Sequence, residues 1–241
     1  MRCCYFYLWL SLLALGCSRS SEAFLARGKA ALKEEKFEEA LEFLNRAITQ
    51  DPKNAQAFNT RGVAYFGLKS YPEAIADYNQ AIRLDSQDYR PWLNRALART
   101  QLGNQEEAQQ DYDQALKIAP QVLDLYLNRG YLRYQMRKLD EARQDFDHVI
   151  AREPSHKAAL YNRGNVYYEQ GNFEAAAQDF AQVLRADSKY TNAYFGLALC
   201  ELRLGKAEEA CLHLDQAIQL KHPEAPQVKA RHCPGGPPLR K

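Results

Sequence analysis

Five arginines recur along this chain at intervals of 34 residues, which raises the question of what chemistry a repeated guanidinium performs. Its planar fork of N–H donors binds carboxylate or phosphate ligands, stabilises an anion during catalysis, or pairs with an internal acid. Four of the five are followed sixteen residues later by an aspartate. The arginines are Arg27, Arg61, Arg95, Arg129 and Arg163, and the aspartates are Asp77, Asp111, Asp145 and Asp179.

Pairs of acidic residues recur as well, for example Glu106 with Glu107 and Glu208 with Glu209. Carboxylate pairs can act in catalysis or bind calcium, but these pairs open predicted helices, where the helix dipole favours negative charge. The five histidines are scattered, and the sequence lacks a phosphate-binding glycine loop, an HExxH motif and a nucleophile elbow. We therefore expect a chain that is not an enzyme and needs no cofactor or metal.

Composition and charge narrow the class of protein further. The chain is 46% hydrophobic and 26% charged, which is typical of a globular or repeat protein and not of a multi-span membrane protein. All 30 acidic residues lie between 21 and 224 together with 26 of the 32 basic ones, so this segment has a net charge of −4. An acidic body is poorly suited to a phosphate backbone, so we expect no nucleic-acid binding.

The elements that position these residues are predicted by a repeat of 34 residues. A small residue recurs at this interval from Gly28 to Ala198, and an alanine follows each one twelve residues later, from Ala40 to Ala210. A large apolar residue stands four positions before each of these small residues, and another stands four positions after each alanine, which is helical spacing. The units are 21–54, 55–88, 89–122, 123–156, 157–190 and 191–224.

This pattern of a large residue, a small residue, alanine, an aromatic residue, alanine and a late proline resembles the tetratricopeptide repeat, and it covers 204 of 241 residues. The resemblance implies an all-α fold, a right-handed α-solenoid of six helix-turn-helix units. In such a hairpin, small residues let two antiparallel helices approach, while large residues fill the space beside the crossing.

The hairpin answers the question about the arginines, because it places each aspartate of the second helix beside the arginine of the first. We predict an internal ladder of Arg–Asp pairs, formed within a unit or to the neighbouring one, which places guanidinium forks between helices and has an architectural role. The sixth unit has Leu197 and His213 at these two positions and lacks the pair.

The resemblance also implies that first helices line a concave groove. Asparagines and tyrosines occupy the positions that face this groove. Amide side chains can bond to a peptide backbone and aromatic rings can cover its side chains, so this combination suits an extended peptide. The alternative is that individual tyrosines pack against neighbouring helices. The predicted groove residues are Asn94, Asn128, Tyr131, Tyr134, Tyr161, Asn162, Asn165 and Tyr168.

The N-terminal segment 1–16 reads as a signal peptide, with Arg2 before an apolar run from Tyr5 to Leu15. The letters LALGC at 13–17 resemble the lipobox of bacterial lipoproteins, which implies that Cys17 carries the lipid. We expect an exported, membrane-anchored lipoprotein on the periplasmic or cell-surface side. Ordinary cleavage after Gly16 and plain secretion are the alternative.

Two features at the C-terminal end remain open. Cys200 and Cys211 fall on facing helices of unit six, where they form a disulfide, hold a metal with His213, or pack as two small apolar side chains, the reading that we favour. The tail 225–241 is rich in Pro and Gly and is predicted to be disordered. Apolar residues of the last helix would then be covered by a short turn over 225–231 or by a partner, which allows self-association through the uncapped last repeat.

Two functions are consistent with these observations. The first is a non-catalytic scaffold or adaptor that binds a protein or extended peptide in the groove, with a lipid anchor in the membrane. The second is a binding module for a non-protein ligand such as a cell-wall glycan.

Overall fold

The computed structural model describes residues 20–233, and within this range the regular structure is entirely helical. None of the described helices is both long enough and apolar enough to cross a membrane. The predicted signal peptide, the predicted lipidation site Cys17 and the last eight residues of the tail lie outside the described residues.

Each sequence unit folds as two helices. The first described helix covers 20–33. The others are α2 (Phe37–Gln50), α3 (Ala55–Gly67), α4 (Tyr71–Leu84), α5 (Tyr89–Gln101), α6 (Gln105–Ile118), α7 (Leu123–Gln135), α8 (Leu139–Arg152), α9 (Lys157–Glu169), α10 (Phe173–Ala186), α11 (Thr191–Arg203), α12 (Ala207–Gln219) and α13 (Ala225–His232).

The helix boundaries follow from local sequence signals. Asn54 and Asp88 cap α3 and α5, because their side chains accept bonds from the amides of Ala57 and Arg90. The turn inside each repeat contains one residue with positive φ, and three of these residues are glycines, such as Gly171 at +78°. The first helices therefore end at the same position in every unit.

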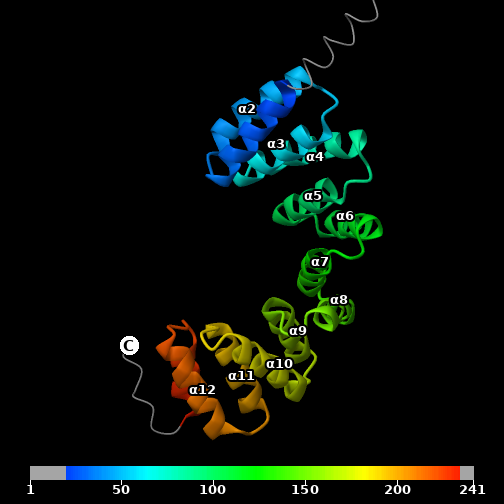
Figure 1. The fold of residues 1–241 in the computed structure, drawn as a ribbon. Coiled ribbons are helices and arrows are strands. Elements are labelled where there is room, and N and C mark those ends of the chain that lie inside the picture. The colour runs from blue at the N-terminus through cyan, green and yellow to red at the C-terminus, as the bar shows by residue number, and fades with distance from the viewer. Residues whose placement is uncertain (1–19, 234–241) are drawn as a thin grey trace, which may run out of the picture. The chain divides into compact units, whose positions relative to one another are not determined.

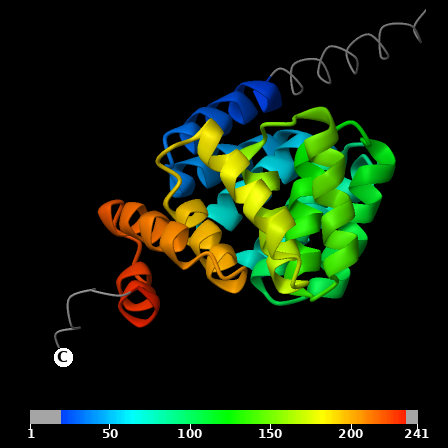
Figure 2. The same cartoon turned by 90° about the horizontal axis from the view of Figure 1, so that it is seen from below.

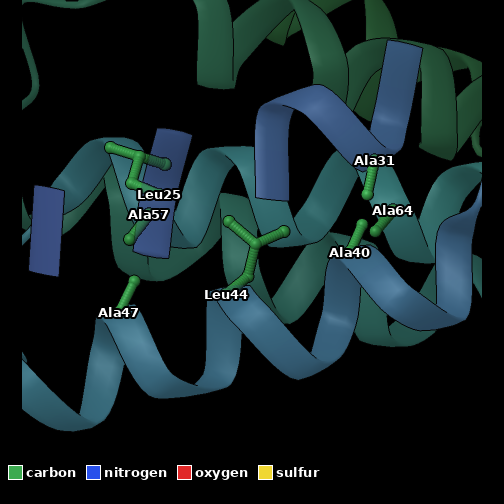
Figure 3. Packing of buried hydrophobic residues seen from close by; sticks show 7 residues of the cluster. All are labelled: Leu25, Ala31, Ala40, Leu44, Ala47, Ala57 and Ala64. Atoms are coloured by element: carbon green, nitrogen blue, oxygen red, sulfur yellow. The ribbon is translucent and has the colours of Figure 1, made fainter. Parts of the chain in front are cut away.

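The core of each repeat lies between its two helices and the first helix of the next repeat. In the first repeat, Leu44 of α2 is fully buried among alanines of three helices, among them Ala31, Ala57 and Ala64 (Figure 3). The small residue at the crossing is essential to this packing. A Cβ atom added to Gly164 would stand 2.8 Å from Cε1 of Phe180, which is closer than carbon atoms normally approach.

The chain divides into two compact units at Val122 and Leu123. The first contains three repeats, ending with α6, and the second contains three repeats and α13. Within each unit, the two helices of a repeat pack together, and the second helix also packs on the first helix of the following repeat (Figure 1). The fold is therefore the predicted α-solenoid of helix pairs.

Two features of the last repeat differ from the sequence analysis. Residues 225–232, predicted to be disordered, form the short helix α13, which packs on α12 at the red end of the chain in Figure 2. Proline and glycine are concentrated after Cys233, so they do not prevent this helix. The prediction that Cys200 and Cys211 both pack as small apolar side chains is confirmed for Cys200, which is a buried free thiol, and is wrong for Cys211, which forms a disulfide with Cys233.

Candidate functional site: the inner helices of the second compact unit

The recurrent arginines form the ion pairs that the sequence predicts. In the second to fifth repeats, Nε and Nη2 of the arginine donate to the two carboxylate oxygens of the aspartate sixteen residues later, with distances of 2.6–3.0 Å. The four aspartates are buried, with at most 5% of each residue exposed. Bidentate geometry in a buried setting makes these pairs structural elements of each hairpin.

The same arginines also bond to the preceding repeat. Nη1 of Arg163 donates to Asp147 of α8 at 2.7 Å, and Nη1 of Arg61 donates to the side chain of Asn45 of α2 at 2.7 Å. The bond to Asp179 is the main cause that raises the pKa of Arg163, so this side chain stays charged. With three donor groups engaged, the Arg163 guanidinium is committed to the fold and not to a ligand.

The sequence analysis missed two parts of this network. Asp111 and Asp145 each accept a bond from a second arginine, Arg99 and Arg133 respectively, one helical turn after the first. In the last repeat the carboxylate lies on the first helix of the pair, since Glu201 of α11 forms a hydrogen bond with Nδ1 of His213 of α12 at 2.7 Å. Glu201 occupies the same position in the sixth repeat as Arg133 in the fourth, four residues after the position of the recurrent arginine. This shared position is the sequence signal that could have identified Glu201.

Seven of the eight predicted groove residues lie on α7 and α9, which contact each other in the second compact unit. We call these seven residues the α7–α9 strip. They are Asn128, Tyr131 and Tyr134 on α7, and Tyr161, Asn162, Asn165 and Tyr168 on α9.

The polar members of the strip have free hydrogen-bonding groups. Asn128, Asn162 and Asn165 are all partly exposed, and none of their side-chain amides forms a hydrogen bond within the described residues. Tyr131 is 48% exposed, one of the largest exposures of a big apolar side chain in the described chain. The side-chain amides of these three asparagines and the ring of Tyr131 can therefore contact a ligand without breaking an existing hydrogen bond.

The other three tyrosines are partly buried and pack against neighbouring helices. Tyr161 lies 5.6 Å from Phe180 between ring centroids, and Tyr168 lies 5.3 Å from Phe173 with its ring edge-on. Tyr134 packs against the cluster around Phe146, and burial raises the pKa of its hydroxyl. These three tyrosines therefore take part in the packing that the sequence analysis gave as the alternative.

The strip continues onto a residue that the sequence analysis did not include. The ring of Tyr190, just before α11, lies 5.2 Å from that of Tyr161. Tyr190 also lines an open depression with Asp187, Lys189 and Asn192. Tyr190 is the last residue of a sequence unit and not part of a first helix, so the groove pattern could not identify it.

Asn94, the eighth predicted residue, lies on α5 in the first compact unit. Its amide donates to the side-chain oxygen of Asn59 on α3 at 3.0 Å. It also lines a small cavity of about 60 Å³ whose other walls include Val63, Phe66 and Leu97. Asn94 thus belongs to a different local environment from the α7–α9 strip, with its amide already engaged.

A model of the tetratricopeptide repeat family matches residues 25–89, 62–122, 127–191 and 163–227. A comparison with curated proteins gave no match.

Solved structures share the fold at low sequence identity. A structure reported in a functional characterisation of Pseudomonas aeruginosa pilF is 19% identical, with a TM-score of 0.77, 90% of this chain covered and 99% of that one. A tetratricopeptide repeat protein from Parabacteroides merdae is 21% identical, with a TM-score of 0.74 and coverages of 88% and 87%. YrrB, described as a TPR protein with an unusual peptide-binding site, is 19% identical, with a TM-score of 0.68 and coverages of 78% and 97%.

Proposed function

Because the chain belongs to the tetratricopeptide repeat family, we propose that it is a non-catalytic scaffold that binds an extended peptide segment of a partner protein along the α7–α9 strip. The observation that carries this proposal is the set of three open amides beside exposed Tyr131. An extended peptide presents backbone N–H and C=O groups along its length, and amide side chains both donate to and accept from them.

The charges around the strip favour a partner that binds through backbone and apolar groups. In the second to fifth repeats the arginine of the first helix, such as Arg129 or Arg163, bonds an aspartate of the second helix. The position before these arginines is an asparagine, and the position before that is Leu127 or Tyr161, so the strip has no lysine there. A free C-terminal carboxylate would therefore gain little over an internal segment.

The experiment is selection of binders from a displayed random-peptide library on the full chain, followed by titration of one selected peptide. Tyr131→Ala and Asn162→Ala should each weaken binding by about 1–2 kcal/mol, as expected for an aromatic anchor and a lost hydrogen bond. Leu102→Ala is the matched control, because Leu102 is 44% exposed but lies on the first compact unit.

Equal affinity of all three variants for the selected peptide would place the binding surface elsewhere. Binding of peptidoglycan fragments, with the same two variants impaired and no peptide selected, would instead assign the strip to a cell-wall glycan.

We propose further that the scaffold is exported and tethered to a membrane through a lipid on Cys17. The sequence LALGC supports the tether, and the Cys211–Cys233 disulfide supports export, because structural disulfides persist mainly in oxidising compartments.

A further inference from the structure

The last repeat is closed by α13, which stands where the first helix of another repeat would pack. Ala225 of α13 is fully buried, and Val228 is partly buried, in the cluster that contains Leu214 and Ala217 of α12. Helix α13 therefore covers an apolar face of α12 that the earlier repeats cover with a full first helix.

The attachments of α13 other than the disulfide are weak. The helix has eight residues, a length at which an isolated helix is unstable in water. Lys229 bonds Asp215 of α12, but the Asp215 side chain is 45% exposed and the Lys229 side chain 25%, so solvent screens the pair and it contributes little. The disulfide joins Cys211, on α12, to Cys233, directly after α13, and so holds the far end of the short helix in place.

We propose that the Cys211–Cys233 bond is a redox-controlled latch, which keeps α13 on α12 and whose reduction by a dithiol releases α13. A thiolate of the dithiol attacks one sulfur of the bond and forms a mixed disulfide, and one cysteine leaves as a thiolate that takes up a proton. The second thiol of the reductant then displaces the other cysteine. Two electrons and two protons pass to the chain, and the reductant becomes a disulfide. This proposal does not depend on the peptide-binding proposal.

Within residues 20–233, no cysteine is suited to supply the attacking thiol. Cys200 is the free thiol of the described residues, and it is completely buried on α11. Burial raises its pKa to about 12, so at neutral pH it stays protonated, whereas the thiolate is the nucleophile in disulfide exchange. The latch therefore responds to an external reductant.

The release should be confined to α13, because the rest of the last repeat has its own contacts. Glu201 of α11 bonds His213 of α12, and Ala198, Ala210 and Leu214 are buried between these helices. The loop before α13 is held separately, since the ring of His222 stacks on Phe195 with centroids 4.0 Å apart. Helices α11 and α12 should thus stay folded when α13 leaves.

The test is hydrogen exchange of the full chain with and without dithiothreitol. The amides of Val228 and Cys233 bond to carbonyls within or just before α13, and we expect their protection to fall at least tenfold on reduction. Amides of α11 and α12 should keep theirs, and a fluorescent apolar dye should bind to the uncovered face of α12. Cys233→Ser should show the open state without reductant and should not respond to it.

Cys200→Ser is the matched control, and it should retain the response to dithiothreitol. Unchanged protection of α13 in the reduced chain and in Cys233→Ser would overturn the proposal. Loss of protection throughout α11 and α12 would overturn it as well, because the bond would then stabilise the whole repeat and not a latch.

Discussion

A single arginine can join three helices when its donors are divided between partners. Arg163 of α9 uses Nε and Nη2 for Asp179 of α10, and Nη1 for Asp147 of α8. The first bonds close its own hairpin, and the last connects it to the preceding one. The guanidinium fork suits this arrangement better than a lysine ammonium, whose three donors share one nitrogen and do not match the two oxygens of a carboxylate in a bidentate pair.

Arg163→Ala should therefore destabilise the chain strongly. Asp179 is only 4% exposed and would be left without its ion pair, which lowers the free energy of unfolding by about 3–5 kcal/mol. Arg129→Ala should cost less, because Asp145 keeps its bond to Arg133. Urea unfolding at neutral pH measures both changes.

The control for this prediction is Arg143→Ala. Arg143 pairs with Asp147 at 3.3 Å with both side chains about one-third exposed, so its loss should change stability by less than about 0.5 kcal/mol. Native-like stability of Arg163→Ala would show that the ladder does not support the fold.

The pairs within a hairpin could be predicted from sequence because an antiparallel helix hairpin brings together residues that are sixteen positions apart in this repeat. Pairing with the neighbouring repeat was left open by the sequence, since it depends on how one hairpin is rotated against the next. The same holds for the groove. The sequence placed seven of its residues on two neighbouring helices, but it did not predict the contact of Tyr161 with Tyr190. Whether these residues bind a ligand stays a prediction.

At the scale of the helix hairpin, the turn between the two helices imposes one backbone conformation on six different residues. Positions 35, 69, 103, 137, 171 and 205 all have positive φ, from 56° to 80°. Glycine occupies three of them, while Glu35, Lys69 and Arg137 adopt the same conformation with a side chain. A residue with a Cβ atom is less stable there than glycine by about 1–2 kcal/mol.

Lys69→Gly should therefore stabilise the chain. The relief of the left-handed conformation is partly offset by the greater freedom of glycine in the unfolded chain, which leaves a net gain of about 0.5–1 kcal/mol. Gly171→Ala should have the opposite effect, of about 1 kcal/mol. Thermal or urea unfolding of the variants measures both changes in stability.

Ser70→Gly is the matched control in the same turn. Its φ is −80° and its side chain makes no capping bond, so glycine should give no gain and should lower stability slightly. If Lys69→Gly and Ser70→Gly destabilise the chain equally, backbone strain at position 69 is not relieved by glycine.

At the scale of the whole chain, the repeat period determined the fold because each unit reproduces the same two helices and the same crossing. First helices begin at Ala55, Tyr89, Leu123, Lys157 and Thr191, which are the first residues of the sequence units. The end of the array was less predictable. Residues after 224 do not belong to a repeat unit, so the repeat pattern does not predict their structure. The high proline and glycine content of the whole tail also pointed away from α13, an eight-residue helix whose stability depends on a disulfide.

The tether is a property of the whole chain, and one residue tests it. If Cys17 carries the lipid, Cys17→Ser removes the acyl chains that partition into the bilayer, and the protein should move from the membrane fraction to the soluble fraction. Cys4→Ser is the matched control, because Cys4 lies in the predicted signal peptide and would be removed on cleavage. Its fractionation should match that of the native chain, and the mature protein should have the same mass. Unaltered fractionation of Cys17→Ser would show that the lipid is not on Cys17, and plain secretion or an uncleaved anchor would then replace the lipoprotein proposal.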